Sequence, residues 1–294
     1  MNRRNLLHGL LLGAAALPLH RLAFAMPAQP AIKDALAARL AALEHRHGGR
    51  LGVAMLDTGS GQHAGYRADE RFLMCSTFKL LAAATVLAHV DRGDEQLDRR
   101  ITFGQDVLLK WAPVTSHHAG APGMTVAQLC QAMITVSDNT AANLLLSSVG
   151  GPAAVTAFVR ALGDPLTRLD RTEPQLNVTR PGDLRDTTTP AAMLGDMRAA
   201  LLGNALSATS RQHLLGWLRG CSTGMDKLRA GLPPDWQAGD KTGSGAQGES
   251  NDVAIIWPPQ RAPLLVAAYY APVAPDAAAG ASVLAEVGRI AASL

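Results

Sequence analysis

An apolar run from Leu80 to Leu87 is the feature that most constrains the fold of this chain. None of its residues is charged, so a helix formed here would be apolar on every side. Such a helix belongs in the middle of a domain rather than on its surface. Ser76 and Lys79 precede the run, three residues apart. Because positions i and i+3 share a helix face, we expect the hydroxyl and the amine to point the same way.

Two interpretations of this pair are open on these residues alone. In one, Ser76 caps the helix and Lys79 extends to the surface. In the other, burial lowers the pKa of Lys79, which then acts as a base for the neighbouring hydroxyl. In that case the free backbone N–H groups at the helix start favour negative charge developing near Ser76.

Strand patterns occur at both ends of the chain, and helix patterns fill the middle. A helix over residues 31–47 and two short strands within 49–72 come first; strands over 235–243, 251–259 and 262–273 and a helix over 276–294 come last. The sequence predicts an α+β fold, an antiparallel sheet flanked by terminal helices with an inserted all-α domain. Residues 26–68 and 220–294 would form the sheet domain and 69–219 the helical one.

The first 25 residues resemble an export signal, with a basic start, an apolar centre and small residues at 23–25. We expect the mature protein to begin near Met26 and to be periplasmic. The arginine pair at 3–4 also resembles a twin-arginine signal, although a Sec signal can carry two arginines. No later apolar run reaches the roughly 20 residues that a membrane span needs, so we predict no membrane anchor.

Charge and cysteine content narrow the function classes. The signal holds three of the 27 basic residues and none of the 24 acidic ones, so the remainder carries equal numbers of each. No electrostatic footprint for nucleic acid or an anionic membrane is therefore expected. Three cysteines, Cys75, Cys130 and Cys221, are too few for a disulfide scaffold, and at least one must stay unpaired. We expect burial of apolar side chains to hold the fold.

Two short patterns match known motifs by chance, and two histidine pairs match no metal-binding signature. Gly220–Gly224 fits Gly-x-Ser-x-Gly, but it follows a helix pattern and no histidine lies beyond His213. Gly243–Gly248 fits a dinucleotide-binding pattern, yet a strand-like run follows where a helix is required. The histidine pairs 45/47 and 117/118 lack further ligands nearby, so we predict surface histidines and no metal site.

Two further polar clusters accompany Ser76 and Lys79. Ser137-Asp138-Asn139 interrupts an apolar helical stretch, where a cap or turn is the alternative, and Lys241-Thr242-Gly243 lies on a predicted strand. In this order the three motifs resemble those of class A serine β-lactamases over essentially the whole mature length. The resemblance implies a monomeric hydrolase of the β-lactam ring that confers β-lactam resistance and uses no metal or cofactor.

The resemblance also implies how the ring opens. Ser76 attacks the carbonyl, and the backbone N–H groups of Ser76 and Ser244 form the oxyanion hole, a contribution of roughly 3 kcal/mol per donor. Ser137 passes a proton to the departing nitrogen, and Asp138 is structural. The substrate-binding residues implied are Asn139, for the side-chain amide, and Lys241, Thr242 and Ser244, for the carboxylate.

The charged, proline-containing stretch from Arg168 to Pro190 is typical of a compact Ω loop. Arg171 and Asp186 either pair across its neck or remain solvated. By the resemblance, Glu173 in this loop activates the water that hydrolyses the acyl-enzyme, and Asn177 holds that water. Penicillin-binding proteins lack this motif. Whether Lys79 or Glu173 deprotonates Ser76 stays open.

The sequence departs from the family pattern at several positions. The additional carboxylate-binding arginine of many class A enzymes is absent, and Lys227 is the candidate to replace it. Cys75 matches a cysteine of class A carbapenemases whose partner corresponds to Gly245, so that disulfide is not expected. Trp111 resembles the aromatic residue at the family's site entrance, and a core tryptophan is the alternative.

The segment from Lys241 to Asp252 resembles cefotaxime-hydrolysing relatives, which favours penicillins and cephalosporins, oxyimino ones included, as substrates. Two other functions share the first three motifs. A D-alanyl-D-alanine peptidase is disfavoured by Glu173 and Asn177. A β-lactam sensor is disfavoured by the same two residues and by the lack of a transmembrane segment.

Overall fold

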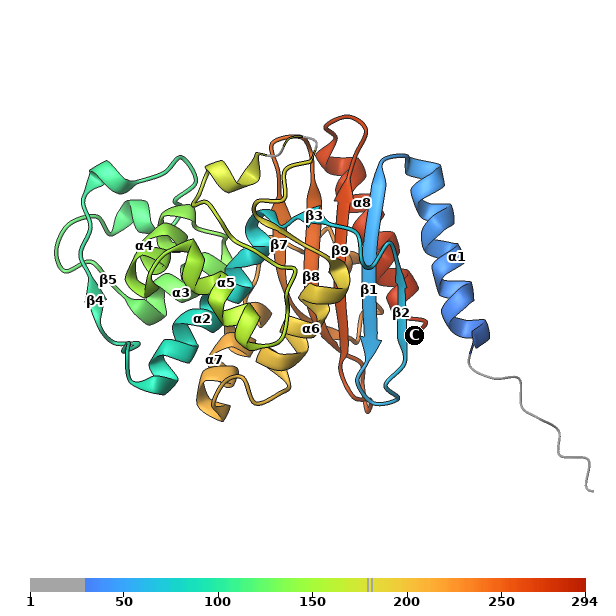
Figure 1. Ribbon diagram of the computed structural model, residues 1–294, viewed down its shortest axis with the longest axis horizontal. Coiled ribbons are helices and arrows are strands. Elements are labelled where there is room, and N and C mark those ends of the chain that lie inside the picture. Colours follow the sequence, from blue (N-terminus) through green and yellow to red (C-terminus); the bar gives the residue numbers. More distant parts are fainter. Residues whose placement is uncertain (1–29, 179, 181) are drawn as a thin grey trace, which may run out of the picture.

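The computed structural model describes residues 30–178, 180 and 182–294, so the predicted export signal lies outside the described residues. Eight helices and a five-stranded sheet form most of the described chain (Figure 1). The helices are α1 (Pro30–His47), α2 (Phe78–Arg92), α3 (Val126–Thr135), α4 (Asn139–Val149), α5 (Pro152–Ala161), α6 (Pro190–Leu201), α7 (Ala208–Arg219) and α8 (Ala277–Ala291). The strands of the sheet are β1 (Arg50–Asp57), β2 (His63–Tyr66), β7 (Gln237–Ser244), β8 (Ser250–Trp257) and β9 (Leu264–Ala271).

The sheet joins the two ends of the chain. Its strand order is β2-β1-β9-β8-β7, and every neighbouring pair is antiparallel. Strand β1 from the N-terminal part pairs along its whole length with β9, so that Arg50 lies opposite Ala271 and Asp57 opposite Leu264. The predicted antiparallel sheet is therefore confirmed, and β7 forms one of its edges.

Side chains of the central strands alternate between two apolar cores. Val53 and Met55 of β1 pack with residues of α1 and α8, whereas Ala54 and Leu56 pack on the opposite face with the helical part. Figure 1 shows α1 and α8 together on one side of the sheet and the helical part on the other. Because both faces are covered, the central strands are apolar on both sides, which the sequence shows as continuous apolar runs.

Helix α2 lies at the centre of the helical part, as the apolar run predicts. All its side chains from Phe78 to Ala88 are buried, and it packs against α3, α4, α5 and α7. It follows a 3₁₀ turn at Cys75–Thr77 and ends at Gly93, whose left-handed φ of 81° suits a glycine cap. The predicted interruption at residues 137–139 separates α3 from α4.

The segment 69–219 is not purely helical, which corrects the all-α description. Strand β3 (Phe72–Leu73) pairs with β6 (Thr187–Thr188), and β4 (Arg100–Ile101) pairs with β5 (Met124–Thr125). These short pairs join the ends of long loops. Helix α6 packs against β1 and β9 and so covers the sheet. Because α6 lies within 69–219 yet packs on the sheet, the division into a sheet domain (26–68 and 220–294) and a helical domain (69–219) is kept as a proposal.

Among the described residues, no single helix combines the length and the apolar composition needed to cross a bilayer. Helices α4 and α5 reach that length and apolar composition only when they are counted together, and the chain bends by 70° between them.

Candidate active site

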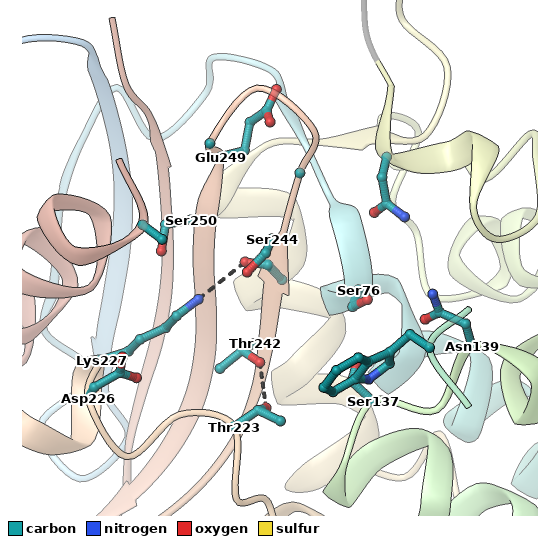
Figure 2. Close-up of a pocket in the computed structure, with 16 residues that line it drawn as sticks. Ser76, Ser137, Asn139, Thr223, Asp226, Lys227, Thr242, Ser244, Glu249 and Ser250 are labelled. Carbon is teal, nitrogen blue, oxygen red and sulfur yellow. Dashed lines mark hydrogen bonds between the residues drawn. The ribbon is translucent and has the colours of Figure 1, made fainter. Parts of the chain in front are cut away.

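A cavity of about 480 Å³ opens between strand β7 and the helical part (Figure 2). The predicted site residues that line it are Ser76, Trp111, Ser137, Asn139, Asn177, Lys227, Thr242 and Ser244. The other three, Lys79, Glu173 and Lys241, are at most 2% exposed and lie directly behind this lining. Residues from distant parts of the chain are thus brought to one place.

Ser76 sits in the 3₁₀ turn that leads into α2, with strand β7 close beside it. A Cβ atom on Gly243 would lie only 2.8 Å from the carbonyl oxygen of Met74 and 3.2 Å from the amide nitrogen of Ser76, so the strand can run here only with a glycine. Cys75 adopts a left-handed φ of 45°, a strained conformation that the surrounding packing must hold. The Asn251 side chain also donates to the Met74 carbonyl, at 3.1 Å, and ties the turn to β8.

The Lys79 ammonium is fully buried, so the surface interpretation of this residue is wrong. Its Nζ donates to Ser137 Oγ at 3.1 Å and to Asn139 Oδ1 at 2.5 Å, and lies 3.2 Å from Glu173 Oε1. Burial lowers the pKa of Lys79, and the Glu173 carboxylate opposes this in part. The hydroxyl of Ser76 donates to Glu173 Oε1 at 3.3 Å. The carboxylate therefore lies within hydrogen-bond distance of both groups.

Ser137 occupies the break between α3 and α4 with a left-handed φ of 59°. Its Oγ accepts hydrogen bonds from Lys79 Nζ at 3.1 Å and from Lys241 Nζ at 3.2 Å. Two ammonium donors occupy both acceptor positions of the oxygen, so the hydroxyl proton is free to point elsewhere, including into the cavity. Burial lowers the pKa of Lys241 to about 8, and the charge of Lys79 adds to this effect.

Asp138 organises the backbone around the cavity. Its buried carboxylate accepts the amide of Ala141, capping α4, and the amides of Val114 and Thr115 at 3.0 and 2.9 Å. The loop fixed in this way carries Trp111, whose side chain is 55% exposed at the cavity. The core interpretation of this tryptophan is therefore wrong.

Glu173 is held by two asparagines. Asn177 Nδ2 donates to its Oε2 at 2.5 Å. Asn143 bonds its backbone twice, donating to the carbonyl at 2.8 Å and accepting from the amide at 3.0 Å. Sequence reasoning missed Asn143. The available signal was its spacing, because it follows Asn139 by four residues on α4 and so lies one turn further along the same helix face.

The predicted pairing across the neck of the Glu173 loop is confirmed. Arg171 Nε donates to Asp186 Oδ2 at 2.5 Å, and the Asp186 carboxylate is fully buried. Its other oxygen accepts the amides of Asp170 and Arg171 at 2.7 and 2.9 Å.

Lys227 reaches the cavity from the loop that follows α7 (Figure 2). Its Nζ lies 3.3 Å from the Gly243 carbonyl oxygen and 3.4 Å from that of Asn251, beside the strand that carries Thr242 and Ser244. Thr223, from the same loop, bonds Thr242 and was not predicted. The three cysteines are buried free thiols. Among the described residues, no group of His, Cys, Asp and Glu side chains could hold a metal ion.

Comparison with known proteins agrees with this geometry. The model of the Beta-lactamase2 family, described as a β-lactamase enzyme family, matches residues 35–293. β-Lactamase OXY-1 of Klebsiella oxytoca is 46% identical over 280 residues, covering 95% of each chain. β-Lactamase L2 of Stenotrophomonas maltophilia is 50% identical over 280 residues, or 94% of this chain and 92% of that one.

Solved structures give the same result. An ancestral class A β-lactamase is 60% identical with a TM-score of 0.85, covering 87% of this chain and 98% of that one. A putative class A β-lactamase, PenP from Rhodopseudomonas palustris, is 54% identical with a TM-score of 0.86, covering 88% and 99%. This chain therefore belongs to the β-lactamase enzyme family, as a class A serine β-lactamase that hydrolyses β-lactams.

Proposed function

We propose that Ser76 opens the ring of penicillins and cephalosporins to form an acyl-enzyme and that Glu173 activates the water that releases it. The observation that carries this proposal is the position of the Glu173 carboxylate, 3.3 Å from Ser76 Oγ and 3.2 Å from Lys79 Nζ. A base placed there can take a proton from water beside a Ser76 ester. Among the described residues, the buried Oδ1 of Asn177 has no hydrogen-bond partner, and it is available to accept from the same water.

In acylation, the Ser76 proton passes to Lys79 or to Glu173 as Oγ bonds to the lactam carbonyl carbon. The lowered pKa of Lys79 supports the lysine, and the direct hydrogen bond supports the glutamate. The amides of Ser76 and Ser244 stabilise the oxyanion. When the C–N bond breaks, Ser137 donates its proton to the lactam nitrogen and is reprotonated from Lys79 or Lys241.

Binding of the substrate uses the two walls of the cavity. Asn139 accepts the side-chain amide, and the carboxylate lies against β7. The carboxylate ligands are Lys241, Thr242 and Ser244, with Lys227 supplying a further cation, and Trp111 lines the entrance. The resemblance of the 241–252 segment to cefotaxime-hydrolysing relatives supports oxyimino cephalosporins among the substrates.

We further propose that the enzyme is a monomer exported to the periplasm by the residue 1–25 signal, with twin-arginine export as the route to test against Sec. In this proposal the reaction uses no metal or cofactor, and the enzyme binds no nucleic acid and carries no membrane anchor. Export as a folded chain would fit buried thiols that need no oxidation.

The first test is intact-protein mass over time after mixing with a penicillin. Wild type should show a transient adduct while ring-opened product accumulates, and Glu173→Gln should keep a lasting one-to-one adduct. Glu286→Gln, on the surface of α8, is the control and should behave as wild type. A lasting adduct on the wild type would instead indicate a penicillin target or sensor, and cleavage of D-Ala-D-Ala peptides would indicate a peptidase.

A further inference from the structure

We propose that Thr223 is a positioning residue that aims the hydroxyl of Thr242 at the substrate carboxylate, as the middle link of a hydrogen-bond chain that begins at the Cys221 thiol. The inference rests on the proposed carboxylate site at Thr242. Cys221 Sγ lies 3.3 Å from Thr223 Oγ1, which lies 2.6 Å from Thr242 Oγ1. Figure 2 shows the bond between the two threonines at the cavity wall.

The direction of this chain follows from what each group can donate. A carboxylate offers only acceptor atoms, so Thr242 must donate its proton to the substrate. That proton is then not available to Thr223, and the 2.6 Å contact requires Thr223 to donate to Thr242. The reversed arrangement would turn the lone pairs of Thr242 toward the carboxylate, where they repel it. Thr223 therefore decides whether the Thr242 hydroxyl attracts or repels the substrate.

Cys221 supplies the donor at the far end. A Thr223 hydroxyl that donates to Thr242 can still accept a hydrogen bond, and the thiol lies within reach. The residue is 3% exposed, and burial, reinforced by the Asp240 charge, raises the pKa of the thiol, so it keeps its proton. The chain S–H to Oγ–H to Oγ–H to carboxylate is then complete and runs in one direction.

The loop that carries Cys221 and Thr223 is fixed on both sides. Ser222 donates to the Thr135 carbonyl oxygen at the end of α3 through its amide at 3.0 Å and its hydroxyl at 3.1 Å. On the other side, a Cβ atom on Gly224 would lie 2.1 Å from Asp240 Oδ2. Only glycine lets the loop approach β7 closely enough for the threonine hydroxyls to meet.

The test compares Thr223→Val with wild type on a penicillin and on its methyl ester. Valine keeps the shape and removes the hydroxyl. We expect KM for the acid to rise about fivefold, with kcat within twofold, because Thr242 loses the hydrogen bond that turns its proton toward the carboxylate. The ester lacks the carboxylate charge, so its KM should change less than twofold. Thr223→Ser should restore wild-type values. Ser222→Ala, which weakens only the bond of the loop to α3, should leave the acid-to-ester ratio unchanged.

A second measurement detects the hydrogen bond between Cys221 and Thr223 directly. The infrared S–H stretching band that disappears in Cys221→Ala should move to higher frequency in Thr223→Val, because the thiol loses its acceptor. Binding of the acid and of the ester can also be measured by calorimetry in a Ser76→Ala background, where no turnover occurs. This measurement tests the role of Thr223 even if the proposed hydrolytic mechanism is wrong. An equal loss of affinity for acid and ester, or an unmoved S–H band, would overturn the proposed role of Thr223.

Discussion

The hydrogen bonds of the Lys227 ammonium in this site are long. Its two hydrogen-bond partners among the described residues are backbone carbonyls at 3.3 and 3.4 Å, near the outer limit for a hydrogen bond, and the ammonium has a third donor. A substrate carboxylate held at Thr242 and Ser244 would lie beside it. We expect Lys227→Met to raise KM for penicillins and cephalosporins about five- to tenfold with little change in kcat, measured by steady-state hydrolysis.

Lys33→Met, at an exposed position of α1, is the matched control and should leave KM unaltered. Unchanged KM in Lys227→Met for every substrate would mean that the lysine serves only to hold the 221–231 loop to the strands.

At this scale, the sequence predicted the groups with strong chemical motifs and missed those that act through geometry. Ser76 and Lys79 are three residues apart, so their shared face follows from the helix period alone. Thr223 and Thr242 meet because a loop packs against an edge strand, and no spacing rule gives that contact. The bond of Ser76 to Glu173, 97 residues away, likewise depends on how the loop folds back.

Among the elements, the loop of residues 168–190 depends on its buried neck. The Asp186 carboxylate satisfies two amides and the Arg171 guanidinium while fully buried. Removing the carboxylate leaves those donors unpaired. Loss of one partner of a buried ion pair typically lowers the free energy of unfolding by about 3 to 5 kcal/mol. We expect Asp186→Ala to displace Glu173, to reduce kcat about 100-fold and to leave an accumulating acyl-enzyme, detected by intact mass.

The matched variant is Asp183→Ala, whose ion pair with the exposed Arg185 lies at the surface of the same loop. It should change kcat less than threefold. If both variants slow turnover equally, the loop as a whole, rather than its neck, positions Glu173.

Regular elements were predictable because their patterns are long. The strands of the sheet are buried on both faces, and α2 is apolar all round, so each appears as a continuous run. The two-residue pairs β3/β6 and β4/β5 carry no such pattern, because their partners lie up to 116 residues apart and only backbone hydrogen bonds define them.

In the molecule as a whole, two apolar cores on either face of the sheet force several ionisable groups out of water. Asp196 on α6 is the clearest case outside the active site. It is 1% exposed, one of its oxygens has no partner among the described residues, and it hydrogen-bonds Asp164 beyond the end of α5. Burial raises the pKa of Asp196 to about 9, and the Asp164 charge adds to the effect. Folding therefore keeps a proton that the unfolded chain releases near pH 4.

The sign of the effect on stability follows from this difference. Below pH 4 both states hold the proton, so it contributes nothing to the pH dependence. Between pH 4 and about 9 only the folded state holds it, so the free energy of unfolding falls as pH rises, by up to about 1.4 kcal/mol per pH unit. Asp196→Asn keeps a donor for Asp164 and does not titrate. We expect the stability of this variant relative to wild type to increase steadily from pH 5 to pH 9, measured by urea unfolding.

Asp98→Asn, at an exposed position, is the reference and should show no such trend over the same range. A constant difference between Asp196→Asn and wild type would mean that Asp196 is already ionised at pH 5, its charge met by Arg160 of α5. A growing difference would instead identify a protonated carboxyl on α6, the helix that packs against β1 and β9. Such a carboxyl would lower the stability of the fold in alkaline solution, and it lies outside the residues that line the cavity.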